Sequence, residues 1–188
     1  VNIIEKHSQI GGRARQFSEQ GFNFDMGPSW YWMPDVFENF FNQFNKSTKD
    51  YYNLIKLDPG FQIIFENQEN LVVPAGYEEL KSLFNKIEPD SAINLNKFMK
   101  EAEFKYGFGM NSVVFHPGVS WKEFCKIDLF KNIFKLQIFS SYKRHVSKYF
   151  KNPKLRALLE FPVLFLGTAP KETPALYSLM AYSGLIQG

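Results

Sequence analysis

The chain has 188 residues, enough for one large domain or two small ones, with hydrophobic residues at 45% and charged residues at 22%. This balance supplies material for a core and argues against intrinsic disorder. The 22 Lys and Arg against 19 Asp and Glu leave a net charge of +3, too small an excess to indicate nucleic acid as a partner. A single cysteine, Cys125, excludes an internal disulfide framework.

Strand and loop patterns alternate over the first part of the chain. Val1–Glu5 is a short apolar run that ends in an acid, which predicts a buried parallel strand. Gln16–Asp25 sets phenylalanines between polar residues around a turn at Gln20 and Gly21, which predicts a hairpin. From Pro34 the apolar residues recur at helical spacing and predict a helix.

Strand patterns and then helical patterns fill the rest of the chain. In order, they predict strands at 54–57, 61–66 and 71–73 and helices at 77–87, 92–106, 130–150, 153–166 and 174–182. A capping-box pattern, Ser120 with Glu123, predicts one further helix that runs toward Leu129. The polar stretch 45–50 predicts a boundary between two domains, 1–50 and 51–188.

An acid and a cluster of glycines and arginines lie close together near the N-terminus. Glu5 ends the predicted strand, where an acid can hydrogen-bond the ribose hydroxyls of an adenine dinucleotide. Gly11 and Gly12 allow a ligand to approach the backbone closely, and the guanidinium groups of Arg13 and Arg15 suit a pyrophosphate. From spacing alone, a glycine turn with solvated arginines explains the pattern equally well.

The motif E-K-x-x-x-x-G-G-R-A-R, followed by G-F-x-F-D-M-G-P-S-W, closely resembles the opening of bacterial-type phytoene and carotenoid desaturases, in the FAD-dependent amine-oxidoreductase superfamily. The resemblance implies an α/β fold, α+β overall. A partial Rossmann-like FAD-binding domain would carry an inserted strand-plus-helix domain for substrate and membrane, largely helical after residue 77. It also implies an N-terminal fragment that lacks the family's first glycine loop and is inactive alone.

The resemblance also assigns roles to residues. The expected FAD-binding residues are Glu5, Gly11, Gly12, Arg13, Arg15, Asp25, Met26, Gly27, Pro28 and Ser29. Glu5 would bind the adenosine ribose, the glycine–arginine cluster would line the pyrophosphate and flavin side, and segment 25–29 would bring backbone to the isoalloxazine. Trp30, Tyr31 and Trp32 are expected to line a hydrocarbon tunnel near the flavin, although core packing is the commoner role of such aromatics.

The sequence identifies no clear general base. Glu123 is a weak candidate, because the family places this helical region over the substrate, but a capping-box acid is the commoner explanation. His145 follows Lys143 and Arg144, which predicts a solvated helix face, and His7 is expected to be exposed. No pair or trio of residues has metal-ligand spacing, so no metal site is expected.

The leading interpretation is a FAD-dependent oxidoreductase that desaturates a polyene precursor such as phytoene in carotenoid biosynthesis, with a quinone or oxygen as electron acceptor. The alternatives are a carotene isomerase, a carotenoid oxygenase or another flavin amine-oxidase-like enzyme, and a non-enzymatic lipid-binding module. Lysines interleaved with apolar residues over 129–150 are typical of an interfacial helix. The pattern alone favours a domain helix with one buried face, whereas the implied lipid-soluble substrate favours a peripheral position on the cytoplasmic membrane.

Overall fold

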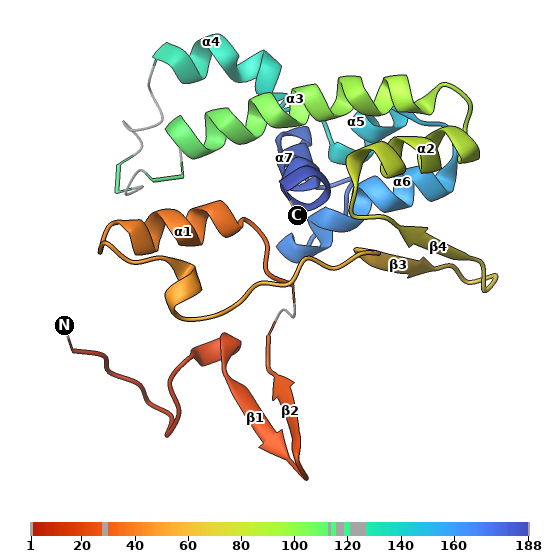
Figure 1. Cartoon of the computed structure of the whole chain (residues 1–188). Helices are drawn as coiled ribbons and strands as arrows, with labels where there is room; N and C mark the ends of the chain where they lie inside the picture. The colour runs from red at the N-terminus through yellow and green to blue at the C-terminus, as the bar shows by residue number, and fades with distance from the viewer. Residues whose placement is uncertain (1, 28–29, 113, 116–118, 121–126, 188) are drawn as a thin grey trace.

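The computed structural model describes residues 2–27, 30–112, 114–115, 119–120 and 127–187, with the backbone only for 127–131. It shows a helical body from which the N-terminal segment and one hairpin project (Figure 1). The elements in chain order are η1 (Gly12–Ala14), β1 (Gln16–Glu19), β2 (Phe22–Asp25), α1 (Pro34–Asn42), η2 (Thr48–Asp50), β3 (Phe61–Ile64), β4 (Asn70–Val73), α2 (Tyr77–Ile87), α3 (Ser91–Ser112), α4 (Ile127–Leu136), α5 (Tyr142–Tyr149), α6 (Pro153–Glu160), η4 (Phe161–Leu166), η5 (Ala175–Ser178), α7 (Leu179–Tyr182) and the π-helical turn η6 (Ser183–Gln187).

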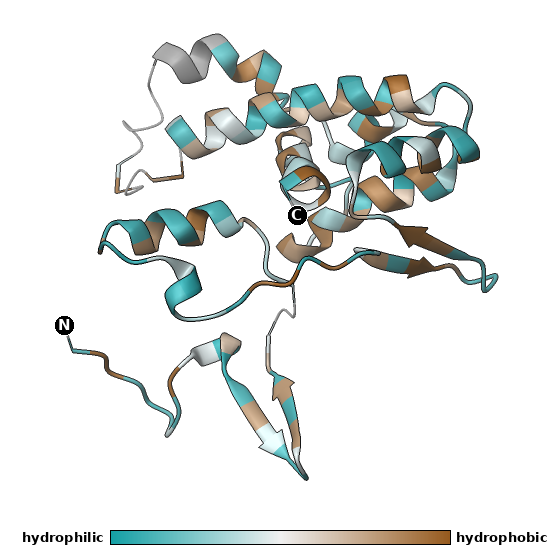
Figure 2. Cartoon of the chain, in the orientation of Figure 1, coloured by the Kyte–Doolittle hydropathy of each residue, from teal (hydrophilic) through white to brown (hydrophobic). Residues whose placement is uncertain are grey.

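The described strands form two separate antiparallel hairpins, β1–β2 and β3–β4. The first confirms the hairpin predicted at 16–25: Phe17 lies opposite Phe24 and their rings stack with centroids 4.9 Å apart. Polar and apolar residues alternate along its ribbon (Figure 2), as the period of a strand requires. The second confirms the predicted strands near 61–66 and 71–73.

Two predicted strands are absent from the described residues. Residues 2–5 are not a strand: no described strand lies beside this segment to accept its hydrogen bonds, and Ile3 and Ile4 are exposed. Segment 54–57 is also irregular and exposed, because the chain there runs along the body without pairing to another strand. The parallel sheet expected from the α/β prediction is therefore not seen in the part of the chain that the structure covers.

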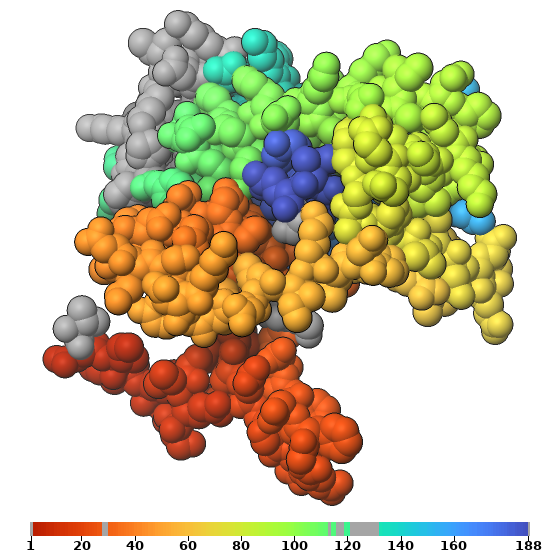
Figure 3. All heavy atoms as spheres, viewed as in Figure 1, coloured from red at the N-terminus to blue at the C-terminus, as the bar shows by residue number. Residues whose placement is uncertain are grey.

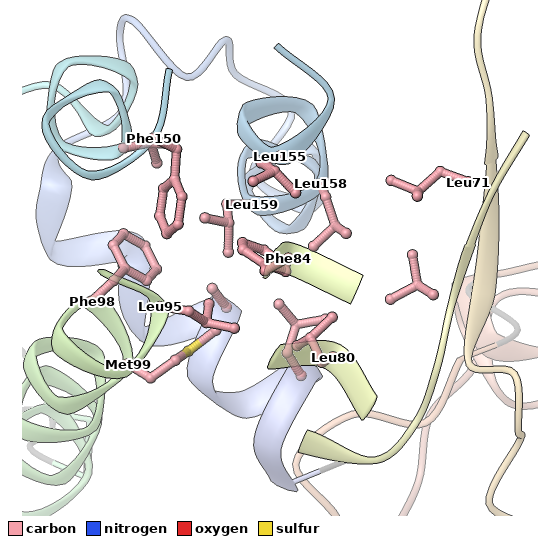
Figure 4. Close-up of a cluster of buried hydrophobic side chains, with 14 of the residues drawn as sticks. Leu71, Leu80, Phe84, Leu95, Phe98, Met99, Phe150, Leu155, Leu158 and Leu159 are labelled. Carbon is pink, nitrogen blue, oxygen red and sulfur yellow. The ribbon is translucent and has the colours of Figure 1, made fainter. Parts of the chain in front are cut away.

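The core lies where α2, α3, α5 and α6 meet, with β4 closing one side (Figure 4). Phe84, Phe98 and Phe150 lie at its centre, and Phe150 meets both other rings in edge-on contacts, at 5.4 Å from Phe84 and 6.2 Å from Phe98. Aromatic pairs in this geometry add to the free energy gained from area burial alone. The helix predicted at 77–87 coincides with α2, and α3 extends the one predicted at 92–106.

The long helix predicted at 130–150 is wrong, because the chain turns between α4 and α5. Gln137 adopts a left-handed φ of 55°, and Ser141 then caps α5 by accepting a hydrogen bond from the backbone N–H of Arg144. The prediction for His145 is also wrong, since its side chain is only 1% exposed. Glu123 and Cys125 lie outside the described residues.

A buried amine ties the C-terminal segment to α3. Lys105 is fully buried, and its Nζ donates to the carbonyl of Ala175 at 3.0 Å, to Ser178 Oγ at 3.0 Å and to Gln137 Oε1 at 3.2 Å. All three donors of the ammonium group are thus used, which is what a buried Lys requires. Burial lowers the pKa of Lys105 from 10.5 to about 8, and Lys148 adds to the effect, while Glu101 opposes it.

Glu101 extends this polar cluster toward α5. Its carboxylate accepts hydrogen bonds from the hydroxyl of Tyr149 and, at 3.3 Å, from Gln137 Nε2. His145 Nε2 lies 3.5 Å from the same carboxylate, too far for a good hydrogen bond. Burial, with the positive charges of Lys105 and Lys148, lowers the pKa of His145 to about 3, so the imidazole is neutral near pH 7.

The lowered pKa of Lys105 predicts that stability rises with pH. Because the folded amine binds its proton less tightly than the unfolded one, the free energy of unfolding should increase from about pH 8 toward pH 10. We expect the increase to be about 2 kcal/mol larger in the native protein than in a Lys105→Met variant, which lacks the titrating group. Urea unfolding across this pH range measures it, and parallel profiles for the two proteins would contradict it.

Candidate functional site

The glycine–arginine turn and the segment after β2 are joined in space. Gly11 and Gly12 have φ of 111° and 54°, in the left-handed region that glycine reaches without strain. Gly27 then packs against this turn so closely that a Cβ there would overlap the carbonyl oxygen of Arg13. The backbone N–H of Met26 also donates to the carbonyl of Arg15 at 2.9 Å. The two motifs, separated by a hairpin in sequence, thus form one surface.

This surface and the segment that precedes it carry groups that fit an adenine dinucleotide. Glu5 is half-buried and its carboxylate accepts a hydrogen bond from the backbone N–H of His7 at 2.9 Å, which leaves one oxygen open. Arg15 is held by a contact of its Nε with the sulfur of Met26 at 3.1 Å. Nothing lies within 4 Å of the position of a Cβ on Gly12, so the turn is open to a ligand. A carboxylate that can accept from ribose hydroxyls and guanidinium groups that can bind phosphate are a suitable donor set, with Glu5 placed upstream of the glycine–arginine turn in sequence.

A pocket of about 580 Å³ lies between the segment that follows Gly27 and the helical body. Four parts of the chain meet there: residues 30–34, the irregular segment 53–57 with the start of β3, residues 74–75 after β4, and the π-helical turn η6. Figure 3 shows this C-terminal part (blue) emerging between α3 and the chain that leads into β3. Its lining residues are Trp30, Tyr31, Trp32, Pro34, Asn53, Leu54, Ile55, Lys56, Leu57, Gly60, Phe61, Pro74, Ala75, Gly184, Leu185 and Gln187. Apolar side chains predominate.

Aromatic rings form one side of the pocket. Trp30 and Trp32 lie parallel with centroids 6.5 Å apart, and Phe161 and Phe165 of η4 pack behind them. Phe61 of β3 completes the group, 5.8 Å from Trp30. Such a group is rigid and has little affinity for water, and its ring faces attract positive charge.

Tyrosine hydroxyls fix the segment that carries these rings. Tyr31 and Tyr52 share a hydrogen bond, and burial with this contact raises the pKa of Tyr31. Tyr106 of α3 donates to the carboxylate of Asp35 at 3.1 Å, which anchors the start of α1 to the helical body. Burial, with the negative charge of Asp35, raises the pKa of Tyr106 to about 12, so its hydroxyl stays protonated and keeps donating.

The structure therefore brings Trp30, Tyr31 and Trp32 to one pocket, next in sequence to the expected flavin segment, of which Pro28 and Ser29 are not described. The weak catalytic candidate Glu123 is not described either. Among the described residues, no three His, Cys, Asp or Glu side chains are grouped to hold a metal ion. The sequence reasoning missed the wall formed by 184–187, which lies more than 120 residues from the tryptophans in sequence. No local pattern signals that contact.

Comparison with known proteins bears on the same region. The family model described as "NAD(P)-binding Rossmann-like domain" matches residues 1–47. A carotenoid 3,4-desaturase of Haloarcula japonica is 37% identical over 183 residues, which is 97% of this chain and 37% of that protein. A 4,4'-diapophytoene desaturase (4,4'-diaponeurosporene-forming) of Staphylococcus aureus is 30% identical over 180 residues, which is 96% of this chain and 36% of that protein.

The chain thus spans little more than a third of the length of these relatives. The matches extend over 96% to 97% of this chain, and both relatives are desaturases. On these grounds the chain belongs to the family of carotenoid and phytoene desaturases.

Proposed function

We propose that the protein carrying this chain is a FAD-dependent desaturase of a carotenoid precursor such as phytoene. The observation that carries the proposal is the apolar pocket of about 580 Å³ whose aromatic wall, Trp30 to Trp32, begins three residues after Gly27 of the dinucleotide-binding surface. A long hydrocarbon offers no groups for specific hydrogen bonds. Shape and apolar contact must therefore hold it beside the cofactor.

The residues of this chain would bind the two reactants and keep water away. Glu5, Arg13 and Arg15 would hold the ribose and pyrophosphate of FAD, with Gly12 allowing close approach. The chemistry that FAD supplies when bound would be uptake of the substrate hydride, while the proton of the adjacent carbon would be released to solvent and a quinone or oxygen would be the final electron acceptor. The ring faces of Trp30 and Trp32 would stabilise positive charge that develops along a polyene as the hydride leaves.

The same pocket is compatible with related reactions. A carotene isomerase, a carotenoid oxygenase or another amine-oxidase-like enzyme would need a similar apolar pocket beside a flavin. A lipid-binding module would need the pocket but no flavin. The dinucleotide-binding surface formed by residues 5–27 favours a flavoenzyme over the lipid-binding module, and the names of the relatives favour desaturation.

The decisive experiment uses the complete protein. Purified protein should be yellow and release FAD on denaturation, and co-expression with phytoene synthesis should shift the carotenoid absorption to longer wavelength, since each desaturation extends the conjugated system. A yellow protein that adds no conjugated double bonds would indicate an isomerase or another flavoenzyme. A colourless protein that takes up no FAD would indicate the lipid-binding module and contradict the proposal.

Gly27 supplies a test of the dinucleotide-binding surface. A Gly27→Ala substitution places a methyl group on the carbonyl oxygen of Arg13, so it should push the glycine–arginine turn away and lower the retained FAD about tenfold or more. Gly107→Ala in α3, where nothing lies within 4 Å of the new methyl group, is the matched control. The ratio of flavin to protein absorbance measures the effect. Equal flavin content in the two variants would argue against this surface as the cofactor site.

We also propose a peripheral contact with the cytoplasmic membrane, now restricted to part of the predicted segment. The α5 half of 129–150 is excluded, because Tyr142, Val146 and Phe150 are fully buried. Phe134 and Phe139, in contrast, are 84% and 82% exposed. No described helix is long and apolar enough to cross a bilayer, so any contact through these helices would be interfacial.

Two phenylalanines test the membrane contact. Changing Phe134 and Phe139 together to serine should reduce liposome flotation of the complete protein about tenfold or more. The variant loses the favourable transfer of two apolar side chains from water into the lipid. The control changes Phe40 and Phe44, which are exposed on and just after α1, to serine. Flotation that is unaffected by the first pair, or equally affected by both, would contradict contact through this segment.

A further inference from the structure

The close contact with Trp32, and not the backbone conformation, requires a glycine at position 184. Its φ lies outside the left-handed region, so any residue could adopt this conformation. A Cβ at this position, however, would lie 2.8 Å from Cη2 and Cζ2 of Trp32, closer than carbon atoms approach one another. The indole of Trp32 therefore rests directly on the backbone of η6, and both residues line the pocket.

The backbone at Gly184 has little freedom to retreat. Ala181 and Ser183, which precede it, are fully buried, and Leu185, which follows it, is 8% exposed. The helical turns that lead into η6 pack on α3 and are held there by the hydrogen bonds from Lys105 to Ala175 and Ser178. An added side chain at 184 would therefore be accommodated by movement of Trp32.

The indole can move in few directions. Trp30 lies parallel to it at 6.5 Å, and Phe165 packs against it at 4.7 Å. The space beside it that contains no protein atoms is the pocket. A side chain at position 184 would consequently push the indole of Trp32 into the pocket. The pocket would then accept only a shorter apolar chain.

We propose that Trp32 and Gly184 form a size-selecting pair that sets how long an apolar chain the pocket accepts. The inference rests on the proposed function, because it treats the pocket as the binding site for the polyene. Selection by this pair is steric. Glycine at 184 lets the indole lie against η6, which leaves the pocket deep, whereas a larger residue would make the pocket shallower. The pair thus determines substrate length and takes no part in the transfer of the hydride.

The test measures binding rather than turnover. Straight-chain alcohols of increasing length compete with a fluorescent polyene fatty acid for the complete protein. Gly184→Ala should weaken binding of the longest alcohols about tenfold relative to the shortest, which corresponds to the loss of one or two buried methylene groups. Adding Trp32→Phe to Gly184→Ala should restore most of the loss, because the smaller ring vacates the overlap.

Control variants keep the test decisive. Gly109→Ala meets only an ordinary contact with Leu179, at 3.9 Å, and should leave the length preference unchanged. If Gly184→Ala does not fold, Trp32→Phe alone should shift preference toward longer or bulkier alcohols. Equal weakening at all lengths, no restoration in the double variant, or no shift in Trp32→Phe would overturn the proposal.

Failure of this inference can be told apart from failure of the proposed function. In one outcome, the complete protein binds FAD and desaturates phytoene-type precursors while its variants show no change of length preference. That result would reject the size-selecting pair alone. A colourless protein whose variants still change length preference would reject the desaturase and leave the pair as a property of a lipid-binding pocket.

Discussion

The buried amine of Lys105 fixes the C-terminal segment, which forms one wall of the pocket, against α3. Its three hydrogen bonds join α3 to Gln137 and to the start of the C-terminal segment. Since that segment continues into Gly184 and Leu185, the position of one pocket wall depends on a lysine in the middle of another helix. A buried amine with every donor used is costly to rearrange, so the wall is fixed against α3.

The other wall depends on contacts of a different kind. Trp30 and Trp32 stack on each other and make edge-on or tilted ring contacts with Phe161 and Phe165, and Tyr106 anchors the following helix through Asp35. Aromatic packing needs no polar partner inside the pocket. The pocket consequently stays apolar although its supports are polar, a combination suited to a hydrocarbon substrate.

Local patterns predicted the elements whose stability is local. The hairpin at 16–25 and helix α2 appear where the period of apolar residues placed them. His145 is buried although its neighbours Lys143 and Arg144 predicted a solvated helix face, because its own place in the helical period decides which face it shares. Because successive residues are rotated by 100°, His145 shares the face of Tyr142 and Val146, both fully buried. The division at residue 50 stays a prediction.

The family and the groups proposed to bind a dinucleotide can be read from the sequence alone, because a carboxylate, two guanidinium groups and paired glycines carry their chemistry wherever the chain folds. Three other features emerge from long-range packing: segment 54–57 lines a pocket instead of forming a strand, the helix breaks at Gln137, and Gly184 meets Trp32. Each of these depends on contacts between residues distant in the chain, and no local pattern encodes such contacts.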